Sequence, residues 1–158
     1  MNRQEHNAPG MDEFKSLLKK FSLKATQQRL AVHKAMLSLG HASADMVAEE
    51  IQREGSANVT VASVYNILAQ LALVGVYDHR LSSNNKMYFD VNTFRHMHLY
   101  DYVNNEYMDV VDDAMMEYID STIGKKRFKG YKVECVDVQI VCRPSRHYKS
   151  KKIEEAAG

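Results

Sequence analysis

The sequence predicts an α+β fold, with a helical first half and a second half rich in strands. In residues 11–74, apolar side chains recur at intervals of three and four, as on one face of an α-helix. Beyond them, short runs of alternating apolar and polar residues predominate, which is the period of a half-buried strand. The change falls near Asp90. We therefore expect one domain at residues 1–89, a second at residues 90–145, and a charged tail without fixed structure at residues 146–158.

Length and composition limit the class of protein. A chain of 158 residues, 45% of them hydrophobic, is long enough for one domain or two small ones with a buried core. It has no apolar run long enough to span a membrane, and its polar start does not resemble a signal peptide, so we expect a cytoplasmic protein. The formal net charge of +1 excludes a strong global attraction to nucleic acid or membrane. Any binding to DNA must therefore depend on a local patch of the surface.

Three helices in the first half have clear start and stop signals. They are expected at residues 27–39, 44–54 and 61–74. Each follows a Ser or Thr whose side chain can accept a hydrogen bond from a free backbone N–H of the first turn: Thr26, Ser43 and Thr60. Glycines follow the last turns and favour termination. A shorter amphipathic helix is expected at residues 11–23, after a start at residues 1–10 without fixed structure.

A hairpin is expected after the helices. Two short strands, residues 76–80 and 86–89, flank the polar turn Ser82-Ser83-Asn84-Asn85. Three helices followed by such a hairpin are the order of a winged helix-turn-helix domain, a DNA-binding fold.

The helix at residues 61–74 is the candidate recognition helix. Its inner face is apolar, whereas its outer face carries small and hydrogen-bonding side chains and no acid, as the major groove requires. Basic side chains near the second helix and on the hairpin would supply phosphate contacts. The predicted DNA-binding residues are Ser63, Tyr65, Asn66, Gln70, Lys24, Arg29, Arg80 and Lys86. An ordinary solvated helix face is the alternative interpretation of this pattern.

A group of side chains that can bind metal follows the hairpin. His96 and His98 are two residues apart in an alternating segment, so both point to one face of a strand and can chelate one ion. Asp90 keeps the same parity if the chain stays extended. Mixed imidazole and carboxylate ligands suit Mn²⁺, Fe²⁺ or Zn²⁺. The alternative is an amphipathic edge hairpin with solvated His and Asp side chains.

Asp109 joins this group only if the intervening turn has the right length. Asn104-Asn105 is expected to form a two-residue type I′ turn, because Asn tolerates positive φ. That turn would pair His98 with Val111 and leave Asp109 diagonal to His98 on the same face. A three-residue turn would reverse the parity and remove Asp109 from the group.

The remaining residues predict one helix and one strand. The helix is expected at residues 112–123, followed by Gly124 and by basic residues whose charge suits a helix C-terminus. Residues 131–142 alternate in polarity, with both faces partly apolar. We expect a strand there that is covered by a helix on one side and by a partner on the other.

Four short motifs follow one another between residues 23 and 109. The first is L-K-A-T-Q-Q-R at residues 23–29, and the second is G-H-A-S-A-D at residues 40–45. The third is V-A-S-V-Y-N at residues 61–66, and the fourth is the spacing D-x₅-H-x-H-x₁₀-D from Asp90 to Asp109. Together these motifs resemble the ferric uptake regulator family of metal-dependent bacterial repressors, although each alone is a weak signal.

The resemblance implies partners and a ligand set. It implies a transcriptional repressor, not an enzyme, that dimerises through its C-terminal α/β domain and binds double-stranded DNA at an inverted-repeat operator. His41, which by itself is a loop histidine, becomes a metal ligand. The implied site holds one Fe²⁺ or Mn²⁺ per chain with the ligands His41, Asp90, His96, His98 and Asp109. Such a site would clamp the two domains together.

Two residues resemble the peroxide-sensing branch of the family. The last ligand is Asp109, where iron-sensing members carry Glu, and Asn66 follows Tyr65, where many iron sensors carry Arg. In that branch ferrous iron reacts with hydrogen peroxide and a ligating histidine is oxidised, so His41 and His96 are the candidates for oxidation. The alternatives are an iron- or manganese-responsive uptake regulator without peroxide sensing, a metal-free winged-helix regulator, and a metalloenzyme that activates water.

The cysteines depart from the family pattern. Its first C-x-x-C pair appears here as Asp101-Tyr102-Val103-Asn104, and its second keeps Cys142 but has Ser145 in the other place. Cys135 does not restore either pair. We therefore expect no structural zinc, and a strand domain held by its apolar core and by dimerisation.

Overall fold

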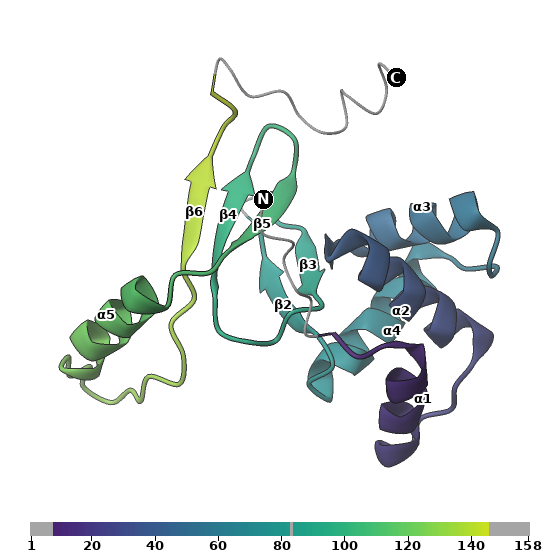
Figure 1. Ribbon diagram of the computed structural model, residues 1–158, viewed down its shortest axis with the longest axis horizontal. Coiled ribbons are helices and arrows are strands. Elements are labelled where there is room, and N and C mark those ends of the chain that lie inside the picture. Colours follow the sequence, from purple (N-terminus) through teal and green to yellow (C-terminus); the bar gives the residue numbers. More distant parts are fainter. Residues whose placement is uncertain (1–7, 83, 146–158) are drawn as a thin grey trace. The chain divides into compact units, whose positions relative to one another are not determined.

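The computed structural model describes residues 8–82 and 84–145, and the chain divides into two compact units, Met1–Phe94 and Arg95–Gly158 (Figure 1). Both units contain strands and at least one helix, so the predicted α+β class is confirmed. The boundary between the units lies after Phe94, a few residues later along the chain than periodicity predicts. Asp90 belongs to the first unit, because it is the last residue of a strand that pairs there.

The first unit has a helical part and an antiparallel sheet. Its elements are α1 (Met11–Lys20), α2 (Gln27–Leu39), β1 (His41–Ala42), α3 (Ala44–Glu54), α4 (Val61–Leu73), β2 (Asp78–Leu81) and β3 (Met87–Asp90). The strands lie in the order β1-β3-β2. Helices α2 to α4 followed by the β2–β3 hairpin confirm the winged helix-turn-helix prediction. The short strand β1 was not expected.

Side-chain caps fix the starts of the main helices, as predicted. Thr26 and Ser43 each accept a hydrogen bond from the backbone N–H three residues further on. Thr60 and Ser63 form a capping box at the start of α4, in which each side chain accepts from the backbone of the other. Loss of such a cap typically costs about 1 kcal/mol, so these residues set where the helices begin.

The apolar face of α4 lies in the core of the first unit. Val64, Leu68 and Leu71 are each 0% exposed and belong to the core cluster that also includes side chains of α1, α2 and α3. Burial of one such side chain is worth about 1.5–3 kcal/mol. The packing fixes the rotation of α4 about its axis, so Tyr65 and Asn66 on the other face are exposed.

Helix α1 ends earlier than its periodicity predicts. It stops at Lys20, because Ser22 adopts a left-handed φ of 57° and the Leu23 N–H donates back to the Leu18 carbonyl at 2.8 Å. The other expected elements of the first unit agree with the structure to within two residues at each end.

Residues 8–10 are held in place, contrary to the expectation that the first ten residues lack fixed structure. The Gly10 carbonyl accepts from the Phe14 N–H at 2.8 Å, at the start of α1. The Pro9 carbonyl lies 2.7 Å from Nε2 of His33. The rest of that segment, Ser83 of the predicted turn and the tail lie outside the described residues: 1–7, 83 and 146–158.

The second unit contains a sheet of three strands and a helix among its described residues. They are β4 (Met97–Asp101), β5 (Glu106–Val110), α5 (Asp113–Gly124) and β6 (Gln139–Cys142). The strand order is β5-β4-β6, with β5 antiparallel and β6 parallel to β4. Asp112 caps α5, since its carboxylate accepts from the Met115 N–H at 2.9 Å.

The register of the β4–β5 hairpin differs from the predicted one. His98 pairs directly with Asp109, not with Val111, so the two-residue turn expected at Asn104-Asn105 is wrong. The pairing is displaced by an even number of residues, and Asp109 therefore still shares a face with His98.

The Asp101 side chain explains the longer turn. Its carboxylate accepts hydrogen bonds from the backbone N–H groups of Val103 (2.9 Å) and Asn104 (3.3 Å). It also accepts from the side-chain amide of Asn104 at 2.7 Å. These bonds give the backbone an alternative to the strand ladder, so β4 ends at Asp101.

Strand β6 is shorter than the alternating pattern predicts. The strand expected at residues 131–142 comprises only Gln139–Cys142. Alternation indicates which side chains share a face, but a strand also needs a neighbour to pair with. The short β4 offers partners to β6 only from His98 to Asp101, so pairing begins at Gln139.

A buried histidine joins three segments of the first unit. His33 on α2 is 0% exposed and stacks on Phe14 of α1 with ring centroids 3.9 Å apart. The Pro9 carbonyl can only accept, so His33 Nε2 carries the proton, and Nδ1 accepts from the Tyr77 hydroxyl at 2.7 Å. Burial lowers the pKa of His33, against a smaller raising effect of the Pro9 carbonyl.

The lowered pKa of His33 predicts a loss of stability in mild acid. The unfolded chain binds a proton at this residue near the ordinary pKa of about 6.5, whereas the folded chain binds it only at lower pH. Stability is therefore fully present above that value and falls as the pH decreases through it. Urea unfolding of metal-free protein between about pH 7 and about pH 5.5 should show a steeper loss for wild type than for His33→Gln. Equal pH slopes for the two proteins would contradict this assignment.

Candidate metal centre

Three ligand-type side chains come together in the second unit. His98 on β4 is the direct Cα partner of Asp109 on β5, and His96 lies immediately before β4. The side chains of His96 and His98 are each 2% exposed and that of Asp109 is 1% exposed. The hairpin register therefore gathers two imidazoles and one carboxylate in a buried group.

The distances in the His96–His98–Asp109 group suit one small cation. Asp109 Oδ1 lies 3.0 Å from His96 Nε2 and 3.6 Å from His98 Nε2, and the ligand atoms lie within 4.8 Å of one another. Ligands held about 2.1 Å from one ion are about 3.0 Å apart at right angles and about 3.4 Å apart in a tetrahedron. The donor set and its spacing therefore fit the predicted Fe²⁺, Mn²⁺ or Zn²⁺.

The first unit holds another pair of ligand-type side chains. His41 on β1 and Asp90 on β3 are Cα partners, and His41 Nε2 lies 3.1 Å from Asp90 Oδ2. Their side chains are 10% and 2% exposed. Gly40, with a φ of 75°, ends α2 and leads the chain into β1, so His41 lies on a strand and not in a loop.

The backbone of Asn92 orients the Asp90 carboxylate. The Asn92 N–H donates to Asp90 Oδ1 at 2.8 Å, and the second oxygen, Oδ2, is the one nearest His41. This hydrogen bond was not predicted from the sequence. An Asp that accepts from the N–H two residues further on is common in turns, so the pattern carries no specific signal.

Some predicted DNA-contacting residues are exposed beside a groove. Tyr65 is 43% exposed and Asn66 is exposed, and both line a groove of about 380 Å³ together with Lys86 and Asp45. Lys86 Nζ lies 3.4 Å from the Asp45 carboxylate. The ion pair between Lys86 and Asp45 was not predicted, because the two residues are distant in sequence and no local pattern indicates that they meet.

Other predicted DNA-contacting residues are engaged within the first unit. The Ser63 hydroxyl takes part in the capping box of α4. The Arg29 guanidinium donates to the side-chain oxygen of Gln70 at 2.7 Å and to the Lys24 carbonyl at 2.7 Å. Arg80 is half-buried on β2. Contacts from Ser63, Arg29 or Gln70 to DNA would require exchange of these hydrogen bonds.

A winged helix-turn-helix unit and a buried His/Asp group define the class: a DNA-binding fold with side chains suited to a metal ion. Residues 20–141 match the sequence profile of the Ferric uptake regulator family. The chain belongs to this family. Proteins of the family are metal-responsive transcription regulators that bind DNA and form dimers, and they are not enzymes. The metalloenzyme alternative is therefore wrong.

Solved structures of the family share the fold. The Vibrio cholerae ferric uptake regulator is 20% identical, with a TM-score of 0.71 and coverage of 83% of this chain and 99% of that chain. The Pseudomonas aeruginosa ferric uptake regulator with manganese is 20% identical, with a TM-score of 0.64 and coverage of 84% and 98%. The Campylobacter jejuni peroxide stress regulator is 25% identical, with a TM-score of 0.58 and coverage of 86% and 99%.

No curated protein sequence matches the chain at a significant level. No helix in residues 8–82 or 84–145 is long and apolar enough to cross a membrane.

Asp101 and Asn104 close the turn between β4 and β5. Their side chains are joined by the 2.7 Å hydrogen bond that closes the hairpin turn. Cys142, which is half-buried, is the Cα partner of Asp101. Burial raises the pKa of the Cys142 thiol, with a smaller contribution from the Asp101 carboxylate. Cys135 is exposed.

Removal of one imidazole from the buried group should abolish tight metal binding. We expect His96→Ala to weaken Mn²⁺ binding by more than roughly 100-fold, because even the loss of a residue outside the ligand shell can cost 10–100-fold. The matched control is His79→Ala, which removes an exposed histidine of β2 and should leave the affinity unchanged. Isothermal titration of metal-free protein measures both. Stoichiometric Mn²⁺ binding that survives His96→Ala would mean that the ion binds elsewhere.

Proposed function

We propose that this protein is a homodimeric transcriptional repressor whose binding to DNA depends on one Fe²⁺ or Mn²⁺ per chain. The observation that carries the proposal is the buried His96–His98–Asp109 group in the second unit. His41 and Asp90 from the first unit complete the proposed ligand set. Mixed nitrogen and oxygen ligands of this kind favour divalent iron or manganese over Ca²⁺ or Cu⁺.

The proposed ligand set couples the ion to the arrangement of the two units. His41 and Asp90 belong to the first unit, and the other three ligands belong to the second. An ion that binds all of them favours one arrangement, because every other arrangement forfeits ligands. If DNA binds the same arrangement, metal and DNA each raise the affinity for the other by the same factor.

The DNA-binding surface is proposed to be the exposed face of α4. Its solvent-facing residues Tyr65 and Asn66 include no acid, and the apolar face beneath them holds the helix in place. Two such helices in a dimer would read an inverted repeat in successive major grooves, roughly 34 Å apart. Lys24, Arg29, Arg80 and Lys86 are proposed to contact phosphates, and Ser63 and Gln70 to contact bases.

The dimer is proposed to form through the second unit. Large apolar side chains remain exposed there, including Tyr118 (70%), Val141 (55%) and Met115 (47%). Exposed apolar area of this kind is costly in water and is removed when two copies associate. We further propose that the unit folds without a structural zinc, since the Asp101 turn supplies its own hydrogen bonds.

Within this class, we propose that the protein senses peroxide. Asp109 as the last ligand and Asn66 after Tyr65 both resemble the peroxide-sensing branch, and the similar structures include a peroxide stress regulator. Ferrous iron, when bound, would promote cleavage of the O–O bond of hydrogen peroxide. In the net reaction one peroxide oxygen would be inserted into a ring C–H bond of His41 or His96, the ring would be oxidised by two electrons, and the other oxygen would leave as water. The oxidised residue would lose its capacity as a ligand, so one ion would no longer be shared by ligands of both units.

The alternative is an iron- or manganese-responsive uptake regulator without peroxide sensing. It is favoured by the similarity to several ferric uptake regulators, including one solved with manganese. A metal-free winged-helix regulator is a less favoured alternative, because it gives no reason to bury Asp109 between two imidazoles.

Metal-dependent DNA binding is tested with a duplex selected from a random library in the presence of Mn²⁺. Wild type should bind it roughly 5–150-fold more tightly with Mn²⁺ than with chelator, the usual range for coupled sites. Asp109→Asn should lose this difference, whereas the matched control Asp113→Asn, an exposed acid on α5, should keep it. Equal affinity of wild type with and without Mn²⁺ would contradict the coupling.

Peroxide sensing is tested by mass spectrometry of peptides after anaerobic loading with Fe²⁺ and exposure to hydrogen peroxide. We expect the mass of one oxygen atom to be added to the peptide of His41 or His96, and DNA binding to be lost in parallel. His79, an exposed histidine of β2, serves as the internal reference and should remain unmodified. Full retention of unmodified His41 and His96 would favour the uptake regulator.

A further inference from the structure

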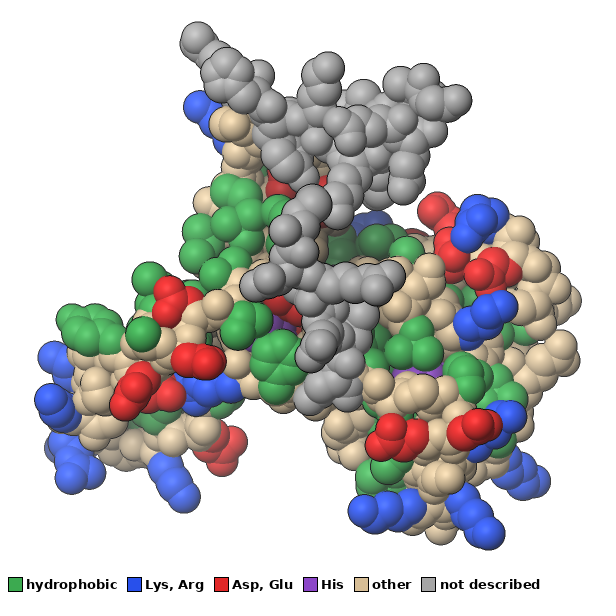
Figure 2. Space-filling model, viewed as in Figure 1, with side chains coloured by type: hydrophobic (Ala, Val, Ile, Leu, Met, Phe, Trp, Pro, Cys, Tyr) green, Lys and Arg blue, Asp and Glu red, His purple; other side chains and the backbone are tan. Residues whose placement is uncertain are grey.

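The longest run of basic side chains in the chain lies in the second unit and has no role in the metal centre. Residues 125–132 read K-K-R-F-K-G-Y-K, with basic residues at five positions and no acid. All of them are exposed. Figure 2 shows Lys and Arg side chains gathered at the lower left, over α5 and the loop after it. Because the formal net charge is only +1, the chain as a whole does not attract a polyanion strongly. A local concentration of cations such as this one can do so.

Stabilisation of the C-terminus of α5 explains only some of these basic residues. Cations near a helix C-terminus are stabilised by the carbonyl groups there, but the effect falls off within the last turn. Lys125, the C-cap of α5, and Lys126 benefit from it. Arg127, Lys129 and Lys132 lie beyond it. None of these five cations forms an ion pair with another residue in the described part of the chain.

The loop presents its tip in a defined conformation. The Tyr131 N–H donates to the Phe128 carbonyl at 3.0 Å, and the two residues form a β-bridge. Gly130 has a φ of 83°, the value that the third position of a type II turn requires. Lys129 is therefore held at the tip of a tight turn, between the exposed rings of Phe128 (48%) and Tyr131 (81%).

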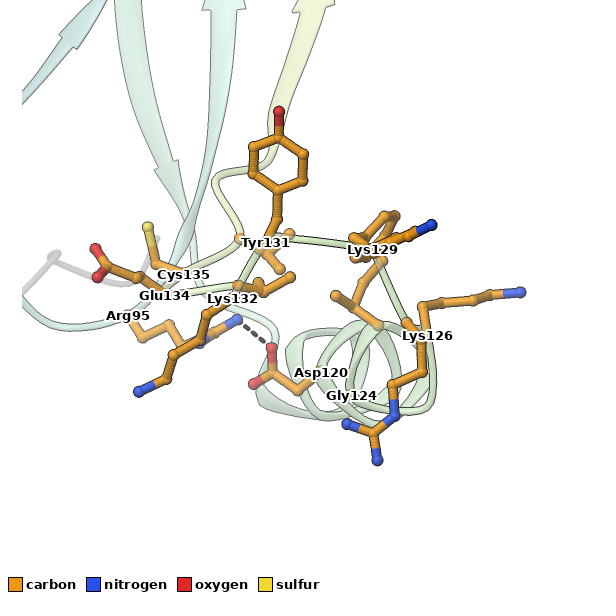
Figure 3. A pocket seen from close by; sticks show the side chains of 14 residues that line it. Arg95, Asp120, Gly124, Lys126, Lys129, Tyr131, Lys132, Glu134 and Cys135 are labelled. Atoms are coloured by element: carbon orange, nitrogen blue, oxygen red, sulfur yellow. Dashed lines mark hydrogen bonds and ion pairs between the residues drawn. The ribbon is translucent and has the colours of Figure 1, made fainter.

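The cations surround a cleft and do not converge in it. The cleft has a volume of about 730 Å³ and is lined by α5 and the loop (Figure 3). Arg95 within it is already paired with Asp120. In Figure 3, the ammonium groups of Lys129 and Lys132 lie on opposite sides of the cleft. Cations spread along a rim suit a chain of phosphates better than a single small anion.

We propose that residues 125–132 form a second DNA-contacting surface, which binds the phosphate backbone of duplex DNA outside the part read by α4. Lys126, Arg127, Lys129 and Lys132 would pair with phosphates, and the Tyr131 hydroxyl would donate to a phosphate oxygen. The inference rests on the proposed repressor function, which already brings the chain to DNA. It adds an electrostatic interaction without sequence preference.

The salt dependence of DNA binding tests this surface. Full-length Mn²⁺-loaded protein is titrated against a fluorescent duplex of random sequence between about 50 mM and about 200 mM salt. The charge-removing variant is Lys126→Gln/Arg127→Gln/Lys129→Gln/Lys132→Gln. Its plot of log affinity against log salt should be shallower than that of wild type by roughly 0.9 for each phosphate that the variant no longer neutralises. The matched control Lys126→Arg/Lys129→Arg/Lys132→Arg keeps the charge and should keep the wild-type slope.

A footprint gives a second measurement that needs no variant. Acetylation of wild type at saturating DNA should spare Lys126, Lys129 and Lys132, whereas the same lysines in free protein should react fully. An unchanged salt slope in a glutamine variant that still binds Mn²⁺, or full acetylation in the complex, would overturn the inference. Loss of binding to phosphatidylglycerol vesicles alone, with the DNA slope unchanged, would assign the surface to lipid and overturn it as well. A wild type that binds no duplex would instead overturn the repressor function itself.

Discussion

Burial of the Asp109 carboxylate is the constraint on which the site in the second unit depends. An ionised carboxylate loses several kcal/mol of hydration when it is removed from water, and this side chain is 1% exposed. Nitrogen atoms of His96 and His98 lie 3.0 and 3.6 Å away. The proposed divalent ion among these three groups would neutralise the carboxylate and leave both imidazoles uncharged, which is the state in which they coordinate. Because the unfolded chain has no such arrangement, binding of that ion would stabilise the fold of the hairpin.

The site also depends on residues that hold no metal. A slip of one residue in the β4–β5 register would move Asp109 to the opposite face of the sheet. Asp101 favours the observed register, because its carboxylate holds the backbone of Val103 and Asn104 in the turn. In the first unit, the Asn92 N–H fixes the Asp90 carboxylate in a similar way. Asp90 and Asp109, two of the proposed ligands, are therefore positioned by hydrogen bonds that local sequence patterns do not distinguish from ordinary turns.

Much of the fold could be predicted from the sequence, because its signals are local. Thr26, Ser43 and Thr60 cap their helices through bonds to backbone a few residues away. The H-x-H spacing places two side chains on the same side wherever the backbone is extended. Predictions were wrong where a distant or competing partner decides: the Asp101 turn and the length of β6. The role proposed for His41 came from family resemblance alone, since β1 is too short to leave a periodic signal.

The hairpin turn at Asp101 has a consequence for how the protein is made. A hydrogen bond from the Asn104 side-chain amide to the Asp101 carboxylate closes this turn. A turn that is closed by cysteine thiolates bound to a metal ion forms only when the ion binds, and oxidation of the thiolates can break it. Here the bonds that close the turn join Asp101 to Val103 and Asn104, two and three residues away. If the unit holds no structural zinc, as proposed, closure of this turn would not depend on the supply of zinc.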